Sequence, residues 1–373
     1  MPQQFTRIAI GLAALVGALV AVLFGLILFQ FFDLGHHRSP GENTVPSVPT
    51  DLVQAVRDGN FKAATSYNIA IQNDPRKSVE EKALATYSAL GVQYRLTGDS
   101  NTRLIDIQNM KDVILDERVS RRTRVNTLNV LANEYLTSDE DPAVFAEMYK
   151  DAPFKEYLVP GDPDRSALQL AEWSYSMMPT SDAAIGIALW YTKQNVLNPK
   201  QPASEMKANV DRGVEYLNKA DAASVQEAQQ DMTYPNSTRY LSYRYWRIIV
   251  VKRLASQKGE PYQSQYQSAY KEFITYAKGV PNILANEYIA YARLYYASQL
   301  AGNGDTAGAK NQLDALAQEM SVAVSSDQKF ARFLRDEHTN RPNGEQWSIV
   351  KKMYAISASF KAAVEKIIVP TSG

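Results

Sequence analysis

A short stretch of the chain combines the residue types that bind partners by ring stacking and by charge. Between Tyr234 and Arg253, aromatic residues are interleaved with arginine and lysine. Such a surface could stack on sugars or bases, or attract an anionic segment of a partner. The alternative at helical spacing is that the rings point into the core while the arginine stems cover the helix flank. The candidate interaction residues are Tyr240, Tyr243, Arg244, Trp246 and Arg247.

Two glutamates that neighbour aromatic residues are the candidates for acid–base chemistry. Glu172 precedes Trp173, and Glu287 precedes Tyr288. An envelope enzyme that cleaves glycan in a helical cleft would need such a carboxyl group, buried and with a raised pKa. Residue type alone singles these two out, so the sequence assigns no catalytic residue.

The amino-acid composition and the missing motifs exclude several classes of catalytic and metal site. The chain has no cysteine, which excludes disulfides, thiolate nucleophiles and metal sites ligated by cysteine. His36 and His37 are adjacent in a segment rich in proline and glycine, and two adjacent ligands make a poor metal site. The glycine-rich phosphate loop and the G-x-S-x-G motif are absent from the sequence. Forty basic residues balance forty acidic ones, so nothing indicates nucleic-acid binding, and no cofactor or metal is expected.

The elements that would position these residues begin with a membrane anchor. Residues 8–29 form an unbroken apolar run, and 30–32 continue it towards an interface. As a helix, the run is about 33 Å long, enough for a hydrocarbon core of about 30 Å. A cleaved signal peptide is the alternative, but its apolar part is usually only about 7–15 residues long and ends at small residues. The sequence therefore predicts a tail at 1–7 and a retained transmembrane helix at 8–32 that contacts the lipid bilayer.

Charges and small residues around the span predict its orientation and a contact face. Arg7 precedes the span and Arg38 follows it, so the positive charges that the positive-inside rule counts nearly balance on the two sides. The short tail and the α-amine favour a cytoplasmic N-terminus, which places the C-terminal domain outside the cytoplasm. Gly17, Ala21 and Gly25 recur at four-residue steps on one helix face, where a second span could pack closely. These three residues are the candidates for self-association into a homo-oligomer.

The chain beyond the span divides into a linker and a long helical part. Residues 33–50 contain three prolines and two glycines, a composition that favours a flexible, extended backbone. From Asp51 onward, apolar residues recur almost throughout at helical spacing. Helical hairpins are predicted around 166–195 and around 205–230. Two more are predicted where 238–257 pairs with 261–279, and where 283–301 pairs with 305–324.

Two segments carry the motif letters of a known repeat family. Leu90-Gly91-x-x-Tyr94 is followed by a Gly-Asp turn, and Leu131-Ala132-x-x-Tyr135 by a polar turn. This pattern resembles the first helix and turn of the tetratricopeptide repeat, in which a small residue lets two helices approach closely. The resemblance implies an α-solenoid of helical hairpins over 51–325. The two motifs are 41 residues apart, against about 34 in the family, so an irregular α-solenoid or bundle is the alternative.

The C-terminal region, 326–373, is predicted to cap this stack. Its first part is polar and ends in a turn at 341–344. From Glu345 to Val369, apolar residues recur every three or four positions, as is typical of one long amphipathic helix. The end of a solenoid must cover its last apolar face, so this helix is interpreted as the cap.

These features predict an all-α, membrane-anchored, non-catalytic scaffold that recruits a partner protein through helical repeats. Tyrosine lines the concave groove of such repeats, and the chain has 22 tyrosines. The layout resembles that of bacterial ancillary translocon subunits with one N-terminal span and a tetratricopeptide-like domain. That likeness implies a place in an envelope, secretion or appendage complex. The alternatives are the glycan-cleaving envelope enzyme and a self-assembling structural membrane protein.

Overall fold

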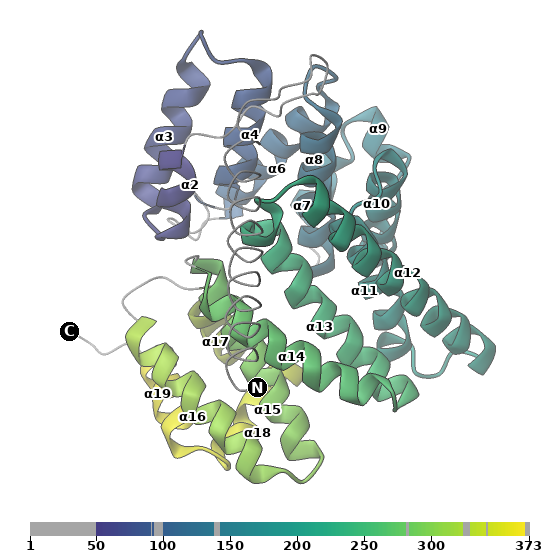
Figure 1. Cartoon of the computed structure of the whole chain (residues 1–373), viewed down its shortest axis with the longest axis vertical. Coiled ribbons are helices and arrows are strands. Elements are labelled where there is room, and N and C mark those ends of the chain that lie inside the picture. Colours follow the sequence, from purple (N-terminus) through teal and green to yellow (C-terminus); the bar gives the residue numbers. More distant parts are fainter. Residues whose placement is uncertain are drawn as a thin grey trace, which may run out of the picture. The chain divides into compact units, whose positions relative to one another are not determined.

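Helices and the turns between them account for the residues that the structure describes. The computed structural model describes residues 50–90, 92, 100–137, 142–280, 283–323, 329–340 and 342–369. These residues contain no strand, so the all-α prediction is confirmed for them. They all belong to one structural unit (Figure 1).

The first helices form a group of three. They are α2 (Thr50–Arg57), α3 (Phe61–Asn73) and α4 (Val79–Ala89). Leu52, Phe61 and Ala64 belong to the apolar cluster that joins them. Asn60 caps α3 by accepting a hydrogen bond from the backbone of Ala63 at 3.2 Å, which fixes where the helix begins. Tyr67 of α3 is 42% exposed and takes no part in this cluster.

The following helices build a second apolar cluster with α10. They are α6 (Ser100–Leu115), α7 (Arg121–Thr137), α8 (Pro142–Met148) and the one-turn α9 (Ala152–Lys155). Tyr157, just after α9, stacks on Trp173 of α10 with ring centres 4.5 Å apart and planes 3° from parallel. Phe154 meets the same indole edge-on at 5.5 Å, so aromatic contacts hold α10 against this part of the chain.

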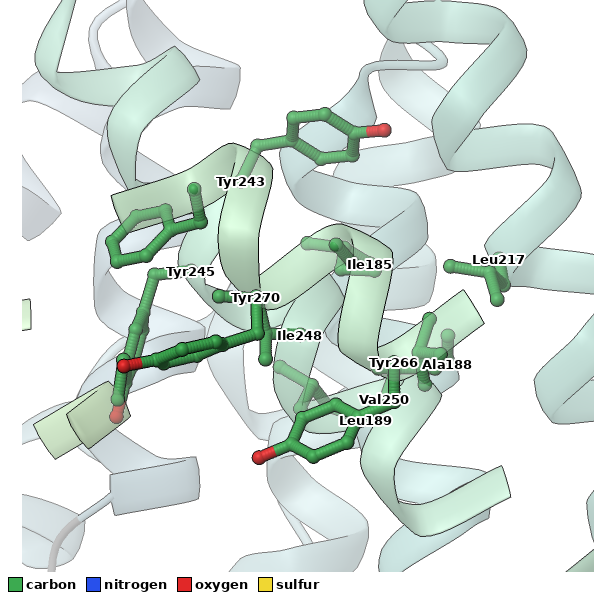
Figure 2. Close-up of a cluster of buried hydrophobic side chains, with 14 of the residues drawn as sticks. Ile185, Ala188, Leu189, Leu217, Tyr243, Tyr245, Ile248, Val250, Tyr266 and Tyr270 are labelled. Atoms are coloured by element: carbon green, nitrogen blue, oxygen red, sulfur yellow. The ribbon is translucent and has the colours of Figure 1, made fainter. Parts of the chain in front are cut away.

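The central helices supply the largest part of the core. They are α10 (Pro163–Met177), α11 (Ser181–Leu197), α12 (Ala203–Gln230), α13 (Thr238–Lys258) and α14 (Tyr262–Lys278). Figure 1 shows α11, α12 and α13 side by side. A Cβ atom at Gly213 of α12 would lie 2.7 Å from the Thr192 methyl group of α11, so glycine permits this close approach. Figure 2 shows the buried tyrosines and aliphatic residues of this core.

The last helices complete the described chain. They are α15 (Ile283–Gly302), α16 (Thr306–Ala323), α17 (Lys329–Asn340), α18 (Glu345–Tyr354) and α19 (Ala358–Ile368). The predicted hairpins at 238–257 with 261–279 and at 283–301 with 305–324 coincide closely with α13–α14 and α15–α16, whose members pack on each other. The pair predicted around 166–195 corresponds to α10 and α11, whereas the pair predicted around 205–230 is wrong, because α12 is one continuous helix there. Gly304 adopts a φ of 84°, a left-handed conformation that suits glycine, in the turn between α15 and α16.

The prediction of a single C-terminal helix over 345–369 is wrong. The helix breaks between α18 and α19, where the Ser357 side chain accepts a hydrogen bond from the backbone of Phe360 at 3.1 Å. The same hydroxyl donates to Asp314 of α16 at 2.6 Å. A serine that caps a helix and binds a carboxylate on a neighbouring helix favours a break over a continuous helix. In addition, α17 occupies much of the polar stretch that precedes α18.

Contacts between elements far apart in the chain go beyond repeat stacking. In a simple solenoid, each repeat contacts only its neighbours. Here α2 contacts α15, and Arg57 of α2 donates a hydrogen bond to the carbonyl of Asn236, just before α13, at 3.5 Å. Helical hairpins are therefore present, whereas a tetratricopeptide-like solenoid stays a prediction. Gly91, residues 93–99 and the turn at 138–141, which belong to its motifs, lie outside the described residues.

The predicted N-terminal elements also lie outside the described residues. This holds for the tail at 1–7, the span at 8–32, the self-association candidates Gly17, Ala21 and Gly25, and the linker up to residue 49. Across the part of the chain that the structure describes, no helix has both the length and the apolar character needed to cross a membrane.

Candidate interaction surface

The basic-aromatic segment predicted as an interaction site lies on α13, and part of it binds α12. Tyr243 is buried and donates its hydroxyl to Asp221 of α12 at 2.5 Å. Arg247 binds both oxygens of the same carboxylate, at 2.8 and 2.9 Å. This bidentate pair and the third hydrogen bond satisfy Asp221 and tie the two helices together.

Another part of the segment contacts α14. Arg244 donates to the Tyr240 hydroxyl at 3.1 Å, and its guanidinium lies 5.1 Å from the centre of the Tyr276 ring. Arg244 also forms an ion pair with Glu272 at 3.5 Å. The positive charge is therefore shared between two rings and a carboxylate of the chain itself.

Trp246 joins neither group. It is half-buried, meets the Tyr245 ring in a T-shaped contact at 5.0 Å, and packs against the central core. The structure thus packs Tyr243 and Arg247 of α13 against α12, and Tyr240 and Arg244 of α13 against α14. The polar groups of all four already have partners within the chain, and the use of this segment as a binding surface stays a prediction.

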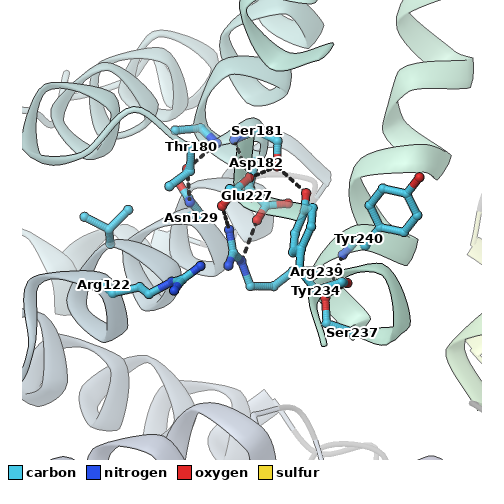
Figure 3. Close-up of polar contacts among 12 residues, drawn as sticks. Arg122, Asn129, Thr180, Ser181, Asp182, Glu227, Tyr234, Ser237, Arg239 and Tyr240 are labelled. Carbon is cyan, nitrogen blue, oxygen red and sulfur yellow. Dashed lines mark hydrogen bonds and ion pairs between the residues drawn. The ribbon is translucent and has the colours of Figure 1, made fainter. Parts of the chain in front are cut away.

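A second group of charges is buried where α11 begins, α12 ends and α13 begins (Figure 3). Arg239 donates from Nε to Asp182 Oδ2 at 2.9 Å and from Nη2 to Glu227 Oε1. The side chains of Arg239, Asp182 and Glu227 are only 12%, 11% and 8% exposed, so all three charges are largely withdrawn from water. We call these three residues the ion cluster.

Hydrogen bonds complete the ion cluster and extend it. Glu227 Oε2 accepts from the Ser181 backbone at 3.1 Å and from its hydroxyl at 2.6 Å. The Ser181 hydroxyl also bonds to the Tyr234 hydroxyl at 2.6 Å. Thr180, the capping residue of α11, accepts from Asn129 of α7 at 3.3 Å. The start of α11 is therefore tied to α7, to α12 and to the turn before α13, and a carboxylate there also suits the helix dipole.

Burial shifts the titration of groups in and around the ion cluster. Burial raises the pKa of Asp182 to about 6, with the positive charge of Arg239 opposing the shift. Burial also raises the pKa of Tyr87, on α4, to about 12. Perturbed groups occur in active sites, but structural ion networks perturb pKa values as well. Both carboxylates of the ion cluster are hydrogen-bonded within the chain, an arrangement suited to joining helices.

Three half-buried tyrosines meet where α10, α11 and α12 pack together. The Tyr216 ring lies 5.7 Å from that of Tyr175, edge-on, and 6.4 Å from that of Tyr191, only 19° from parallel. Tyr191 also meets Trp190 edge-on at 5.0 Å. The rings come from three different helices, so the packing of those helices fixes their relative positions.

Charged residues surround these rings. Along α12, Arg212, Glu215, Tyr216 and Lys219 recur at three- and four-residue steps and therefore share one face. Glu215 accepts hydrogen bonds from Arg212 at 2.9 Å and from Lys219 at 2.7 Å. The Lys219 ammonium lies 4.3 Å from the centre of the Tyr216 ring. We call this region the tyrosine surface, which consists of Glu172, Tyr175, Tyr191, Arg212, Glu215, Tyr216 and Lys219.

Glu172 is the member of the tyrosine surface whose charge is unpaired. Its carboxylate makes no hydrogen bond or ion pair with any residue that the structure describes. Although Glu172 is exposed as a residue, its carboxyl group lies partly out of water, and this burial raises its pKa against the opposing charge of Arg212. Burial, and then the charge of Glu172, also raise the pKa of Tyr191.

The other proposed acid–base residue lies in a different environment. Glu287 of α15 is only 1% exposed, so a glycan chain could not reach it without rearrangement of the surrounding helices. Within the described ranges, no three side chains of the metal-binding types gather into a possible ion site. His36 and His37 fall outside those ranges.

Sequence reasoning selected Glu172 but missed the rings beside it. The spacing of Arg212, Glu215, Tyr216 and Lys219 was a signal for one charged aromatic helix face. The sequence did not show how α10, α11 and α12 pack together. That packing places the rings of Tyr175 and Tyr191 beside Tyr216 on α12. No protein-family model, curated protein or solved structure matches this chain.

Proposed function

We propose that this chain is a membrane-anchored, non-catalytic scaffold that recruits a partner protein through its helical domain. The apolar segment 8–32 would hold it in the bilayer, with the domain outside the cytoplasm, as part of an envelope, secretion or appendage complex. The observation that carries the proposal is the tyrosine surface, where three half-buried rings and a set of charges lie together on the packed helices α10, α11 and α12.

Tyrosine rings of this kind suit protein recognition. A tyrosine offers a large contact area with few rotatable bonds, so it loses little conformational entropy on binding. Residues at the centre of protein interfaces are enriched in tyrosine, tryptophan and arginine. The rings of Tyr175, Tyr191 and Tyr216 are held by contacts with one another, so they do not have to be ordered when the partner binds.

Site-directed photo-crosslinking in intact membranes tests this proposal. A photoreactive phenylalanine analogue replaces Tyr216 in the full chain, and the matched control places it at Tyr67, an exposed tyrosine on α3. We expect one reproducible crosslinked protein from position 216 and none of the same mass from position 67.

A second variant ties the crosslink to the surface itself. With the analogue at position 216, Tyr191→Ala removes a neighbouring ring, and we expect the crosslink yield to fall about tenfold, the loss typical of one interface anchor. The proposal is wrong if positions 216 and 67 capture the same set of proteins, or if Tyr191→Ala leaves the yield unchanged.

A further inference from the structure

The first three helices of the described chain have an apolar core of their own. Its members all come from α2, α3, α4 or the residues just after α4, and they are Leu52, Ala55, Phe61, Ala64, Ile71, Ala85, Ala89 and Val92. Gln72 of α3 also donates to the Lys82 carbonyl at 3.0 Å and to the Thr86 hydroxyl at 3.2 Å, both on α4. Figure 1 shows these helices packed together, and we call them the α2–α4 group. A group with its own core and internal hydrogen bonds can move as one body.

The α2–α4 group meets α6 and α7 through a smaller set of apolar side chains. Ala83 of α4 packs with Val113 of α6 and with Val119 in the turn before α7, in a cluster separate from the core of the group. These three small side chains bury less apolar surface than the eight of that core. The hydrophobic effect therefore holds the group together more strongly than it holds the group against α6 and α7.

Glu80, in the first turn of α4, ties the α2–α4 group to α7 with three hydrogen bonds. Its Oε2 atom accepts from the Ser120 backbone at 2.7 Å. Its Oε1 atom accepts from the Ser120 hydroxyl at 2.9 Å and from the Thr123 hydroxyl at 2.6 Å. Ser120 directly precedes α7, so the carboxylate binds the positive end of that helix. Hydrogen bonds to a charged group are stronger than neutral ones, which makes Glu80 a strong polar contact between the two parts.

Other contacts of the α2–α4 group are weaker in kind. The hydrogen bond from Arg57 to the Asn236 carbonyl is 3.5 Å long, beyond the usual range for such bonds. Leu90, at the end of α4, is only half-buried where it packs against the apolar cluster around α10. That cluster itself runs from Ile107 of α6 to Ile187 of α11, so those helices share one core. The α2–α4 group is therefore held to its neighbours less tightly than they are held to one another.

We propose that the α2–α4 group opens away from α6 and α7 as one body, and that Glu80 is the latch that keeps it closed. Opening uncovers Ala83, Val113 and Val119 and leaves the core of the group intact. The inference goes beyond the proposed function and does not depend on it, because it concerns a motion within the helical domain. In the proposed scaffold, α2 would follow the linker from the membrane span, so this motion would change how the rest of the domain is held at the bilayer.

Thiol labelling tests this motion, because the chain has no cysteine of its own. Ala83→Cys places a single thiol in the contact with α6 and α7, whereas Ala85→Cys places one in the core of the group. Both alanines lie on α4 and are buried, at 4% and 0% exposed. The full chain in detergent micelles is treated with an excess of a thiol reagent. We expect the thiol at position 83 to react about tenfold faster or more, because opening as one body exposes that position alone.

Removal of the latch gives the second readout. Added to each cysteine variant, Glu80→Gln should raise the labelling rate at position 83 about tenfold, the effect of losing a hydrogen-bonded charge, and leave the rate at position 85 unchanged. Asp74→Asn is the matched control. Asp74 belongs to the same group of helices, but its carboxylate binds Arg76 two residues away, so both labelling rates should stay the same.

Two results would overturn the inference. Equal labelling rates at positions 83 and 85, or an equal acceleration of both by Glu80→Gln, would show that α4 unfolds locally instead of moving with its group. An unchanged rate at position 83 in Glu80→Gln would show that Glu80 is no latch. Hydrogen exchange of the full chain without either cysteine checks the same point, since exchange within α3 should be equal in Glu80→Gln and the original chain. Faster exchange in α3 would contradict opening as one body.

Discussion

The ion cluster and the tyrosine surface use the same residue types on neighbouring helices, but they leave their charges in different states. In the ion cluster, Glu227 accepts from Arg239 and from both donors of Ser181. In the tyrosine surface, Glu172 has no such partner among the described residues. Burial acts on both regions, since it raises the pKa of Asp182 in one and of Glu172 in the other.

This difference separates a carboxylate that joins helices from one that the described chain leaves without a hydrogen bond or ion pair. A buried carboxylate whose hydrogen bonds are all made within the chain has little to offer a ligand, and its removal leaves other groups unpaired. A carboxylate that lies at the surface without a partner contributes little to the fold and can still form an ion pair. The two regions therefore respond differently to substitution.

The largest difference is expected between Glu227→Ala and Glu172→Ala. Loss of the Glu227 carboxylate leaves Arg239 paired with Asp182 alone and leaves the buried Ser181 backbone N–H without its acceptor. We therefore expect a loss of about 3–5 kcal/mol in the free energy of unfolding. Loss of the Glu172 carboxylate should change it by about 0.5 kcal/mol or less. Urea unfolding of the full chain in micelles, followed by circular dichroism, measures both values. Similar losses in the two variants would contradict the comparison.

The next effect concerns the packing that positions the tyrosine surface. Gly213→Ala places a methyl group 2.7 Å from Thr192, so α11 and α12 must move apart, and we expect a loss of about 1–3 kcal/mol. Gly302, at the end of α15, has no atom within 4 Å of the added Cβ position. Gly302→Ala is therefore the control and should stay within about 0.5 kcal/mol of the original chain. Equal stabilities for the two variants would show that α12 does not need glycine at its crossing with α11.

Local patterns in the sequence predicted much of the helical content but less of its arrangement. The hairpins at 238–257 with 261–279 and at 283–301 with 305–324 followed from apolar spacing and turn residues, and the structure has α13–α14 and α15–α16 there. The C-terminal break was missed because Ser357 also fits a helix interior, and its bond to Asp314 joins residues 43 positions apart.

The two polar regions depend on contacts that no local pattern specifies. Arg239 binds Asp182, 57 positions earlier in the chain, and Glu227 binds Ser181, 46 positions earlier. Which aromatic rings face the core and which face water also depends on how α11 and α12 pack. Periodicity therefore suggested a basic-aromatic face on α13, whereas Tyr243 of that face is buried against Asp221.

The smallest expected effect tests the protonation of the ion cluster. The pKa of Asp182 is about 6 in the folded chain, against an ordinary value of 3.8, so the folded state holds a proton that the unfolded state has lost between these values. The contribution of Asp182 to stability must therefore fall as the pH rises from about 4 to about 6. Asp182→Asn has no group that titrates there, so the stability of the original chain minus that of the variant should fall over the same window.

The size of that fall is set by two opposing influences. A shift of two pKa units corresponds to about 3 kcal/mol, but Asp182 lies in the first turn of α11, where the helix dipole favours its charged form, so we expect about 1–2 kcal/mol. Urea unfolding of both proteins at pH 4, 5, 6 and 7 supplies the difference. If the difference rises with pH instead, Arg239 holds Asp182 in its charged form more strongly than burial opposes it. Both carboxylates of the ion cluster would then be held chiefly by charge, and the contrast with the unpaired Glu172 would be greater still.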